Sequence, residues 1–257
     1  ALMYDGKALQ SGTSHYFGQE FAKAFDIKFQ NEKSKVEHVY QTSWGVSTRL
    51  IGAVIMVHGD DEGLVLPPYV APTQVVIIPI QGKKEVVVDT TNDLYNKIKE
   101  TGIRVNLDDS NRSPGWKFSE YEMKGVPLRI EVGPRDIENN QVTVVKRHNR
   151  EKITISLDEI VNEIPKLLNE IHNEMYEKAL NHVNENTRTA KTYGEFKEHL
   201  QKGGYVKLSI AGEEAETIIK EDTGATARAI VEEELVTEIC PITNKKATQT
   251  ILFARAY

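Results

Sequence analysis

The sequence predicts a multidomain protein of the α/β and α+β classes, and three features support this prediction. The wholly apolar, β-branched run Val75–Ile80 has the composition of a strand that is buried on both faces of a sheet. Strand-like and helix-like segments alternate after this run, as they do in layered α/β domains. Three prolines between Pro67 and Pro72 interrupt helix and strand alike, and they indicate a domain boundary just before the run.

The first forty residues are predicted to contain a loop followed by a short helix. The small and polar residues Gly12–His15 form the predicted loop. Aromatic residues recur at helical spacing between Phe17 and Phe25, and Thr13 or Ser14 is placed to cap that helix.

Arg49 stands at the start of the next predicted helix. The alternating segment Val36–Thr42 is predicted as a strand, and the apolar segment Leu50–Val57 as a buried helix that ends in a turn at His58–Asp60. A helix start gathers unpaired N–H groups, and an arginine beside it adds a permanent positive charge, so this junction can hold a phosphate chain. The alternative is a core helix with a solvated arginine at its end.

Further elements follow the domain boundary. A long helix is predicted from Ile160 to about Asn186, with a kink or break at Pro165. The other predicted elements are a helix at Thr91–Glu100, strands at Ile103–Leu107, Leu128–Val132 and Val142–Arg147, a helix at Lys191–Gln201, and strands at Val206–Ile210 and Ile251–Ala254.

Composition and charge exclude several classes of protein. No apolar run approaches the length of about 20 residues that a membrane-spanning helix needs, and the first residues do not form a signal peptide. The single cysteine excludes an internal disulfide framework. The net charge of −6 does not indicate nucleic-acid binding, although residues 112–152 carry nine Lys and Arg against six Asp and Glu. That basic segment is either an ordinary local fluctuation or a surface for phosphates.

Several motifs resemble those of prolyl-tRNA synthetases, in the order in which that family carries them. The motifs are the pocket loop Gln10–Gln19, the class II motif 3 segments Ser43–Gly45, Ser47–Gly52 and Val57–Asp60, the anticodon-domain segments Gly115–Phe118, Lys124–Pro127 and Glu131–Asp136, and the terminal Phe253–Tyr257. The terminal tyrosine is similar to that of the archaeal and eukaryotic-type enzymes. The resemblance covers nearly the whole chain.

The resemblance implies three domains. Residues 1–72 are expected to be the rear part of an antiparallel-sheet class II catalytic domain, and residues 73–175 an α/β anticodon-binding domain with a mixed sheet. Residues 176–257 are expected to form a small α+β C-terminal domain. Class II motifs 1 and 2 would lie before this sequence. The chain is therefore expected to be a C-terminal portion, incomplete for catalysis.

Roles for individual residues in the first domain follow from the same resemblance. Arg49 is expected to be catalytic, because its guanidinium would pair with the γ-phosphate of ATP. The expected ATP-binding residues are Gln10, Thr13, Thr48 and Arg49, and the expected proline-binding residues are His15, Ser43, Trp44 and Gly45. The alternatives are a helix cap for Thr13, an exposed polar residue for His15 and a core aromatic for Trp44.

The anticodon-domain motifs imply a second set of residues. Proline anticodons carry two adjacent guanines, which arginine can bind at O6 and N7 while a carboxylate accepts from N–H groups. The expected anticodon residues are Glu122, Arg129 and Arg135, with Lys117 as a backbone contact. Their alternative is a solvated face of strands and loops.

The terminal module differs most from the family. Ala211, Ala215 and Thr243 occupy places where the resemblance leads us to expect zinc-binding cysteines, and only Cys240 remains. One thiolate cannot hold a tetrahedral zinc ion, so zinc is not expected and no metal ligands are assigned. The module is expected to be held by apolar packing that involves Ile210, Ile218, Ile230, Ile239 and Phe253.

The expected activity is ATP-dependent formation of prolyl-adenylate and transfer of the prolyl group to the 3′ end of tRNA(Pro). The implied ligands are L-proline, tRNA(Pro) and ATP with Mg²⁺, which is bound as a substrate. A homodimer in the full-length enzyme, a cytoplasmic location and no membrane contact are also expected. The alternative is a non-catalytic tRNA-binding module derived from a synthetase.

Overall fold

The apolar run that begins at Val75 forms an inner strand of a five-stranded mixed sheet in the computed structural model, which describes residues 1–231 and 235–257. Every residue of its strand, β5 (Val75–Pro79), is buried, as the sequence predicts. The strand order is β6-β5-β7-β8-β9, and β6 and β7 run parallel to β5. Strand β8 runs antiparallel to both of its neighbours, β7 and β9. The other strands are β6 (Val105–Leu107), β7 (Leu128–Val132), β8 (Gln141–Lys146) and β9 (Lys152–Ser156).

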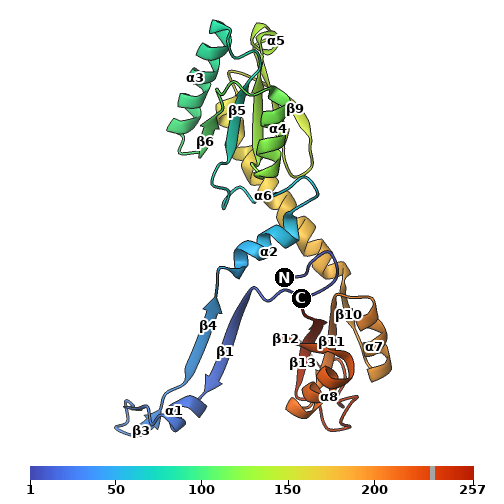
Figure 1. Ribbon diagram of the computed structural model, residues 1–257. Coiled ribbons are helices and arrows are strands. Elements are labelled where there is room, and N and C mark those ends of the chain that lie inside the picture. Colours follow the sequence, from blue (N-terminus) through green and yellow to red (C-terminus); the bar gives the residue numbers. More distant parts are fainter. Residues whose placement is uncertain (232–234) are drawn as a thin grey trace. The chain divides into compact units, whose positions relative to one another are not determined.

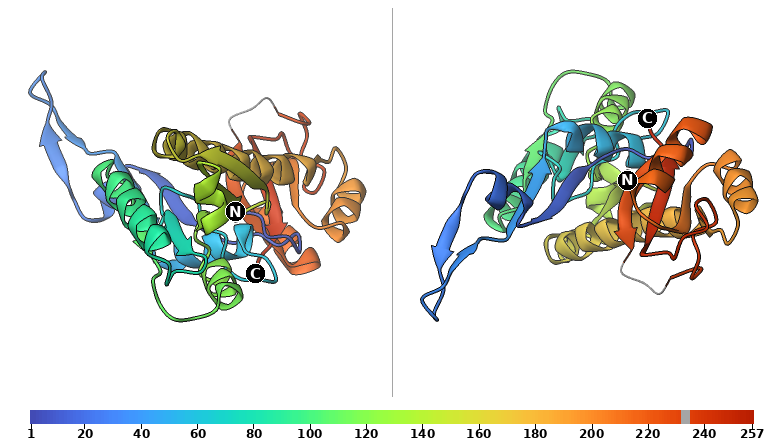
Figure 2. Two further views of the ribbon diagram at one scale, coloured as in Figure 1. Left: turned by 90° about the horizontal axis from the view of Figure 1, so that it is seen from above. Right: turned by 90° about the horizontal axis from the view of Figure 1, so that it is seen from below.

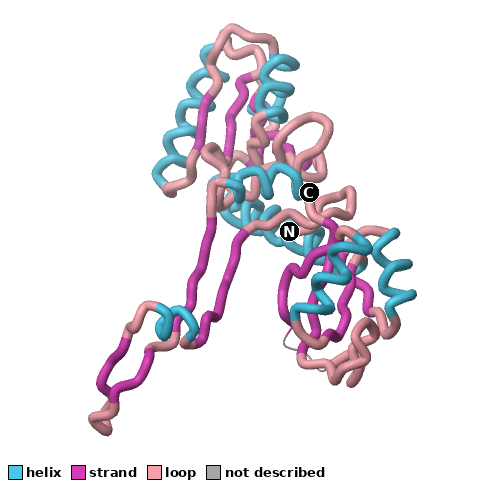
Figure 3. The backbone as a smooth tube through the Cα atoms, turned by 60° about the horizontal axis from the view of Figure 1, so that its bottom comes forward, coloured by secondary structure: helices cyan, strands magenta, loops and turns pink. Residues whose placement is uncertain are grey.

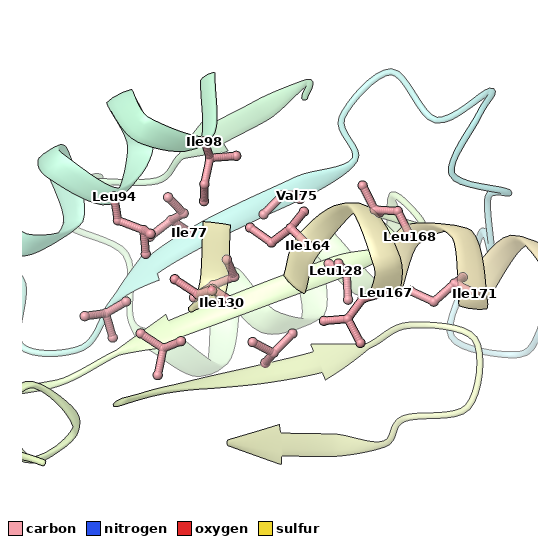
Figure 4. Close-up of a cluster of buried hydrophobic side chains, with 14 of the residues drawn as sticks. Val75, Ile77, Leu94, Ile98, Leu128, Ile130, Ile164, Leu167, Leu168 and Ile171 are labelled. Atoms are coloured by element: carbon pink, nitrogen blue, oxygen red, sulfur yellow. The ribbon is translucent and has the colours of Figure 1, made fainter. Parts of the chain in front are cut away.

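Helices cover both faces of this sheet (Figure 1). Val75 and Ile77 pack with the buried side chains of α3 (Glu85–Glu100) and α6 (Ile160–Glu185), as Figure 4 shows. Residues 76 and 78 pack on the other face with Phe118 and Tyr121 from α4 (Pro114–Met123). The short α5 (Pro134–Glu138) follows β7 directly. The predicted α/β domain with a mixed sheet is thus confirmed.

The element predictions for this region were only partly right. Helix α3 begins at Glu85, earlier than the predicted Thr91, and α4, α5 and β9 were not predicted. Helix α6 continues through Pro165, so the predicted break does not occur, while the alternative of a kink stays a prediction. A proline near the first turns of a helix removes only one intrahelical hydrogen bond, and the apolar face of α6 is buried on both sides of it.

A narrow two-stranded arm forms most of the first fifty residues (Figure 3). Strand β1 (Gly12–Gly18) pairs antiparallel with β4 (Gln41–Val46) in a sheet of two strands, which Figure 2 shows in blue. The arm also contains α1 (Glu20–Ala24), β2 (Lys28–Gln30) and β3 (Val36–His38).

Three predictions for the arm were wrong. The loop predicted at Gln10–Gln19 is largely strand β1, so Thr13 and Ser14 lie in a strand and do not cap α1. The single strand predicted at Val36–Thr42 is interrupted after His38. Pairing of β1 with β4 joins residues about thirty positions apart, and such long-range pairing leaves little local signal.

Helix α2 (Arg49–His58) forms where it was predicted, but it is not a buried helix. Ala53 is its only buried residue, while Ile51 is 66% exposed and Leu50 and Ile55 are also exposed. Apolar side chains at helical spacing create a face that can be buried, but packing requires a partner layer.

The C-terminal residues form a second, four-stranded sheet with two helices. The strand order is β10-β11-β13-β12, and only β10 and β11 are parallel. The elements are β10 (Thr187–Thr189), α7 (Tyr193–Gln201), β11 (Tyr205–Ile210), α8 (Glu213–Thr223), β12 (Ala225–Val231) and β13 (Gln249–Arg255). Ile210 and Phe253 lie in the core as predicted, whereas Ile218, Ile230 and Ile239 are exposed, contrary to prediction.

Residue contacts divide the chain into two compact units, residues 54–184 and residues 1–53 with 185–257. The domain boundary predicted at residue 175 falls inside α6, and the one predicted at residue 72 falls in the segment before β5. The three-domain division therefore stays a prediction. Among the described residues, no helix is both long and apolar enough to cross a membrane.

Candidate functional site

The β1–β4 ribbon places several predicted site residues on one face. Thr13 is paired with Gly45, and His15 with Ser43. Residues directly opposite each other in an antiparallel pair point to the same face, and so do residues two apart along a strand. All four residues therefore share one face. A Cβ at Gly45 would lie only 2.9 Å from the Thr13 Oγ1 atom, so any other residue at position 45 would force the Thr13 side chain to move.

Trp44 lies on the opposite face of the ribbon. It is paired with Ser14, one position from both Ser43 and Gly45, and its side chain is 82% exposed. The Trp44 indole and the His15 side chain therefore lie on opposite faces of the ribbon. Its predicted role as a wall of the proline pocket stays a prediction.

Arg49 is the first residue of α2 and borders a surface hollow that Gln10 and Thr13 also line. The backbone N–H of Arg49 donates to Ser47 Oγ over 3.3 Å, and the first turn of α2 contains no acidic residue. The hollow thus joins a guanidinium, an amide, a hydroxyl and the N-terminus of a ten-residue helix, all suited to an anion. Thr48 precedes the helix and is exposed, but it is not among the lining residues.

A second group of predicted residues meets between α4 and β7. Arg129 on β7 donates through Nη1 to Glu122 on α4 over 2.7 Å and through Nε to Glu131 over 3.0 Å. Its guanidinium lies 4.1 Å from the ring centroid of Phe118. The Arg129 side chain is only 8% exposed, while that of Glu122 is 39% exposed. The pair therefore offers a carboxylate to solvent beside a guanidinium that is held in one orientation.

A buried arginine fixes the helix end that carries Glu122. Arg147 donates through its Nη atoms to both carboxylate oxygens of Asp60, over 2.6 and 2.7 Å, and through Nε to the Glu122 carbonyl oxygen over 2.9 Å. Its hydrogen bonds to Asp60 are the main cause that lowers the pKa of that carboxyl group to about 2.

Two glycines allow the segment before β5 to run close to the end of α4, because a Cβ at Gly63 or Gly125 would collide with backbone atoms.

The remaining two predicted anticodon residues are not in contact with this pair in the described contacts. Lys117 is 3% exposed, and its Nζ atom donates to the Asp108 carbonyl oxygen over 2.6 Å, an arrangement that stabilises the loop before α4. Arg135 lies exposed on α5, just after β7 ends.

Sequence reasoning missed Phe118 and Glu131 as neighbours of Arg129, and Asp60 and Arg147 as a buried ion pair. Glu131 follows Arg129 by two residues on a strand, a spacing that could have indicated a shared face. Asp60 and Arg147 are far apart in sequence, and no local pattern links them.

The residues around Cys240 differ from a metal site. Among the described residues, no group of three or more His, Cys, Asp or Glu side chains is placed to hold a metal ion. Cys240 is fully buried. Burial raises the pKa of its thiol, but hydrogen bonds from Thr243, Ile242 and Ala211 outweigh burial and lower it. The alanines at positions 211 and 215 offer no ligand atoms, so this donor set does not fit zinc.

Two protein-family models match segments of the chain. Residues 74–167 match the anticodon binding domain, and residues 193–257 match the C-terminal domain of prolyl-tRNA synthetase. The first segment contains the α4–β7 pair of Glu122 and Arg129, and the second contains three of the four strands of the terminal sheet, β11, β12 and β13.

Whole proteins extend this match over the full chain. The proline–tRNA ligase of Phytoplasma australiense is 57% identical over all 257 residues, and that of Clostridium novyi is 53% identical over 260 aligned positions. Over its whole length, the chain matches the C-terminal part of proline–tRNA ligases. It spans about half the length of these curated relatives, 54% in both cases.

A solved prolyl-tRNA synthetase has the same fold. The crystal structure of the Cryptosporidium parvum enzyme with L-proline and AMP superposes on 98% of this chain with a TM-score of 0.90 and 42% identity, and the match covers 56% of that enzyme. The predicted fold class is thus confirmed: mixed and antiparallel sheets with helices, in a chain that contains an anticodon-binding domain and a C-terminal domain like that of prolyl-tRNA synthetase.

Proposed function

We propose that the chain is the C-terminal portion of a proline–tRNA ligase, which forms prolyl-adenylate from L-proline and ATP and transfers the prolyl group to tRNA(Pro). The match to proline–tRNA ligases over the whole chain, at 50–57% identity, carries the proposal. The joint hollow of Gln10, Thr13 and Arg49 supports the nucleotide half of the reaction, because it gathers hydrogen-bond donors and a fixed positive charge.

In this proposal Arg49 is the catalytic charge clamp. Its position at the first residue of α2 lets the guanidinium and the helix N-terminus act on the same phosphate. Gln10, Thr13 and Thr48 complete the ATP set, and Mg²⁺ enters with ATP as part of the substrate. The face of the ribbon with His15, Ser43 and Gly45 would bind proline, and the exposed Trp44 would act from the other face.

The Glu122–Arg129 pair is proposed to read the anticodon. The exposed carboxylate of Glu122 can accept from guanine N–H groups, while the arginine offers donors that remain beyond its two ion pairs. Arg135 is proposed as a further contact, because it is exposed at the carboxyl end of β7. Lys117 is buried against Asp108, so we propose that it acts on tRNA only by holding its loop in place.

Several finer assignments belong to the same proposal. The archaeal and eukaryotic-type subtype rests on the terminal Tyr257 and on the likeness to the Cryptosporidium parvum enzyme, although the bacterial ligases of Phytoplasma and Clostridium are more similar in sequence. The domain limits 1–72, 73–175 and 176–257, a homodimeric full-length enzyme, a cytoplasmic location and a terminal domain without zinc complete it.

The alternative, a non-catalytic tRNA-binding module, is not favoured. Such a module would have no need for a phosphate-suited hollow around Arg49, whereas a ligase requires one.

A chimera tests the proposed activity. The chain would replace the matching C-terminal part of the Phytoplasma australiense ligase, and proline-dependent exchange of pyrophosphate into ATP would be measured. We expect exchange and tRNA(Pro) charging at rates within about tenfold of the parent enzyme, because 57% identity preserves the fold. A folded chimera that charges no tRNA(Pro) would refute the proposal.

A further inference from the structure

A second hollow is also lined by the Gln10–Thr13 segment. The strand residues Ala227–Ala229 of β12 and Tyr205 of β11 line it, together with the chain from Ala8 to His15. It shares Gln10–Thr13 with the hollow that contains Arg49, so the same short segment borders two neighbouring depressions. The proposed function makes use only of the first.

Arg228 lies at a β-bulge in strand β12. Ala227 is paired with Phe253 and Ala229 with Leu252, which are adjacent on β13, so Arg228 is the extra residue on β12. A bulge of this kind redirects one side chain away from the regular alternation of the strand, and bulges are frequent beside binding sites.

The Arg228 guanidinium has a donor without a partner. One of its Nη atoms donates to the Thr226 hydroxyl, but the Nε atom is buried and has no hydrogen-bond partner among residues 1–231 and 235–257. Buried donors in proteins are rarely left without a partner, so an unsatisfied one calls for a bound water, ion or ligand group. A guanidinium prefers the oxygen atoms of a phosphate or carboxylate.

The other lining residues favour an anion as well. Besides Arg228 the described lining residues with polar side chains are Gln10, Ser11, Thr13, Ser14, His15 and Tyr205, and none of these lining residues is acidic. Burial raises the pKa of the Tyr205 hydroxyl while the charge of Arg228 acts to lower it, so the two groups lie within electrostatic reach. The hollow therefore combines the Arg228 guanidinium and the amino group of Ala1 with several neutral polar side chains, in a chain whose net charge is −6.

We propose that this hollow is a phosphate-binding site in which Arg228 holds the phosphodiester backbone of the acceptor end of tRNA. The inference rests on the proposed function, because that function requires the terminal nucleotides of tRNA to reach the Gln10–His15 segment. A single-stranded RNA end carries one negative charge per nucleotide, and a second cation beside the shared segment would guide it along its path. Arg228 would be a binding residue supplied by the C-terminal module.

Fluorescence anisotropy with the complete 257-residue chain tests the inference. The probe is a labelled single-stranded RNA that ends in CCA, and the proteins are the wild type, Arg228→Ala, Arg228→Lys and Arg255→Ala. Arg255 is the matched control, since it is an exposed arginine on the neighbouring strand β13 and does not line the hollow. All proteins are acetylated at the N-terminus, because the amino group of Ala1 also borders the hollow.

We expect Arg228→Ala to weaken binding of the probe about tenfold, and its plot of log Kd against log salt to lose about 0.7 in slope, as for one phosphate contact to a single strand. Arg228→Lys should keep part of the affinity, and Arg255→Ala should bind as the wild type does. Equal binding by the wild type and Arg228→Ala, or no binding of the probe by the wild type, would overturn the inference.

Two further measurements separate the possible sources of failure. Competition by inorganic phosphate or ATP at the concentration of probe phosphates, abolished by Arg228→Ala, would show a site for free phosphates and overturn the assignment to RNA. Binding of an anticodon stem-loop of tRNA(Pro) to the same proteins tests the proposed function separately. If the stem-loop binds and Arg228→Ala leaves the CCA probe unaffected, the inference fails while the proposed function stands.

Discussion

The ion pair of Asp60 with Arg147 should stabilise residues 54–184 in a way that depends on pH. The Arg147 side chain is 4% exposed and that of Asp60 is 34% exposed, and two short hydrogen bonds join them. Asp60→Asn removes the negative charge but keeps one oxygen acceptor. Asp60→Ala removes both and leaves the guanidinium buried without its partner.

The size of the effect follows from the pKa of Asp60. Hydrogen bonds from Arg147 lower it from an ordinary value of 3.8 to about 2. At about 1.4 kcal/mol per pKa unit this corresponds to roughly 2.4 kcal/mol, which we reduce to about 1–2 kcal/mol because a third of Asp60 is in contact with solvent. We expect Asp60→Asn to lower the unfolding free energy at pH 7 by that amount, and Asp60→Ala by about 3–5 kcal/mol.

The sign of the pH dependence is fixed by the direction of the pKa shift. A carboxyl group with a lowered pKa in the folded state stabilises that state fully above the unfolded pKa. The stabilisation by Asp60 should therefore be complete above about pH 4 and be lost as the pH falls towards 2. The difference between wild type and Asp60→Asn should shrink across the same interval.

Urea unfolding followed by tryptophan fluorescence measures this difference. The chain has two tryptophans, so a Trp44→Phe background leaves Trp116 on α4 as the reporter for the relevant unit. Glu62→Gln is the matched control, because Glu62 pairs with the exposed Arg150 and should change stability by less than about 1 kcal/mol. Equal stability of Asp60→Asn and wild type at pH 7, or a difference that stays constant from pH 5 to 2, would refute this reasoning.

Three further predictions concern function and metal binding. In the chimera, Arg49→Ala should lower proline-dependent pyrophosphate exchange by about two to four powers of ten, since a charge clamp supplies several kcal/mol; a near-normal rate would remove Arg49 from the mechanism. Arg129→Ala should weaken binding of tRNA(Pro) by about 1–3 kcal/mol and relax discrimination at the anticodon guanines, whereas equal weakening for all tRNAs would indicate phosphate contacts. Thermal unfolding of the purified chain should be unchanged by excess chelator, and about one zinc per chain by elemental analysis would contradict that expectation.

The sequence predicted best those elements whose signal is local. The run from Val75 is apolar on both faces because helices cover both faces of its sheet. Its composition alone was therefore enough to predict a buried strand. Motif residues identified the anticodon-binding domain. The pairing of β1 with β4 was not predictable in the same way, because a two-stranded ribbon with exposed faces imposes no strict alternation of apolar and polar residues.

Candidate site residues of the same charge type differ in their exposure to solvent, which the sequence did not reveal. Lys117 and Arg135 are both cationic residues of the anticodon motifs, yet one is buried against Asp108 and the other is exposed. The contact between Glu122 and Arg129 depends on how α4 packs against β7. The two residues are seven positions apart on different elements, so their spacing in the sequence does not predict this contact. Tertiary packing thus decides which charges are available to a ligand.

The most direct test of the account is whether the chain itself distinguishes the proline anticodon. Isothermal titration or fluorescence anisotropy would compare the complete 257-residue chain with two stem-loops that differ only in the two adjacent guanines of the anticodon, replaced in one by adenines. The account predicts that the guanine stem-loop binds at least ten times more tightly, and that Arg129→Ala removes most of this preference. Equal affinity for the two stem-loops at the same salt concentration would contradict it.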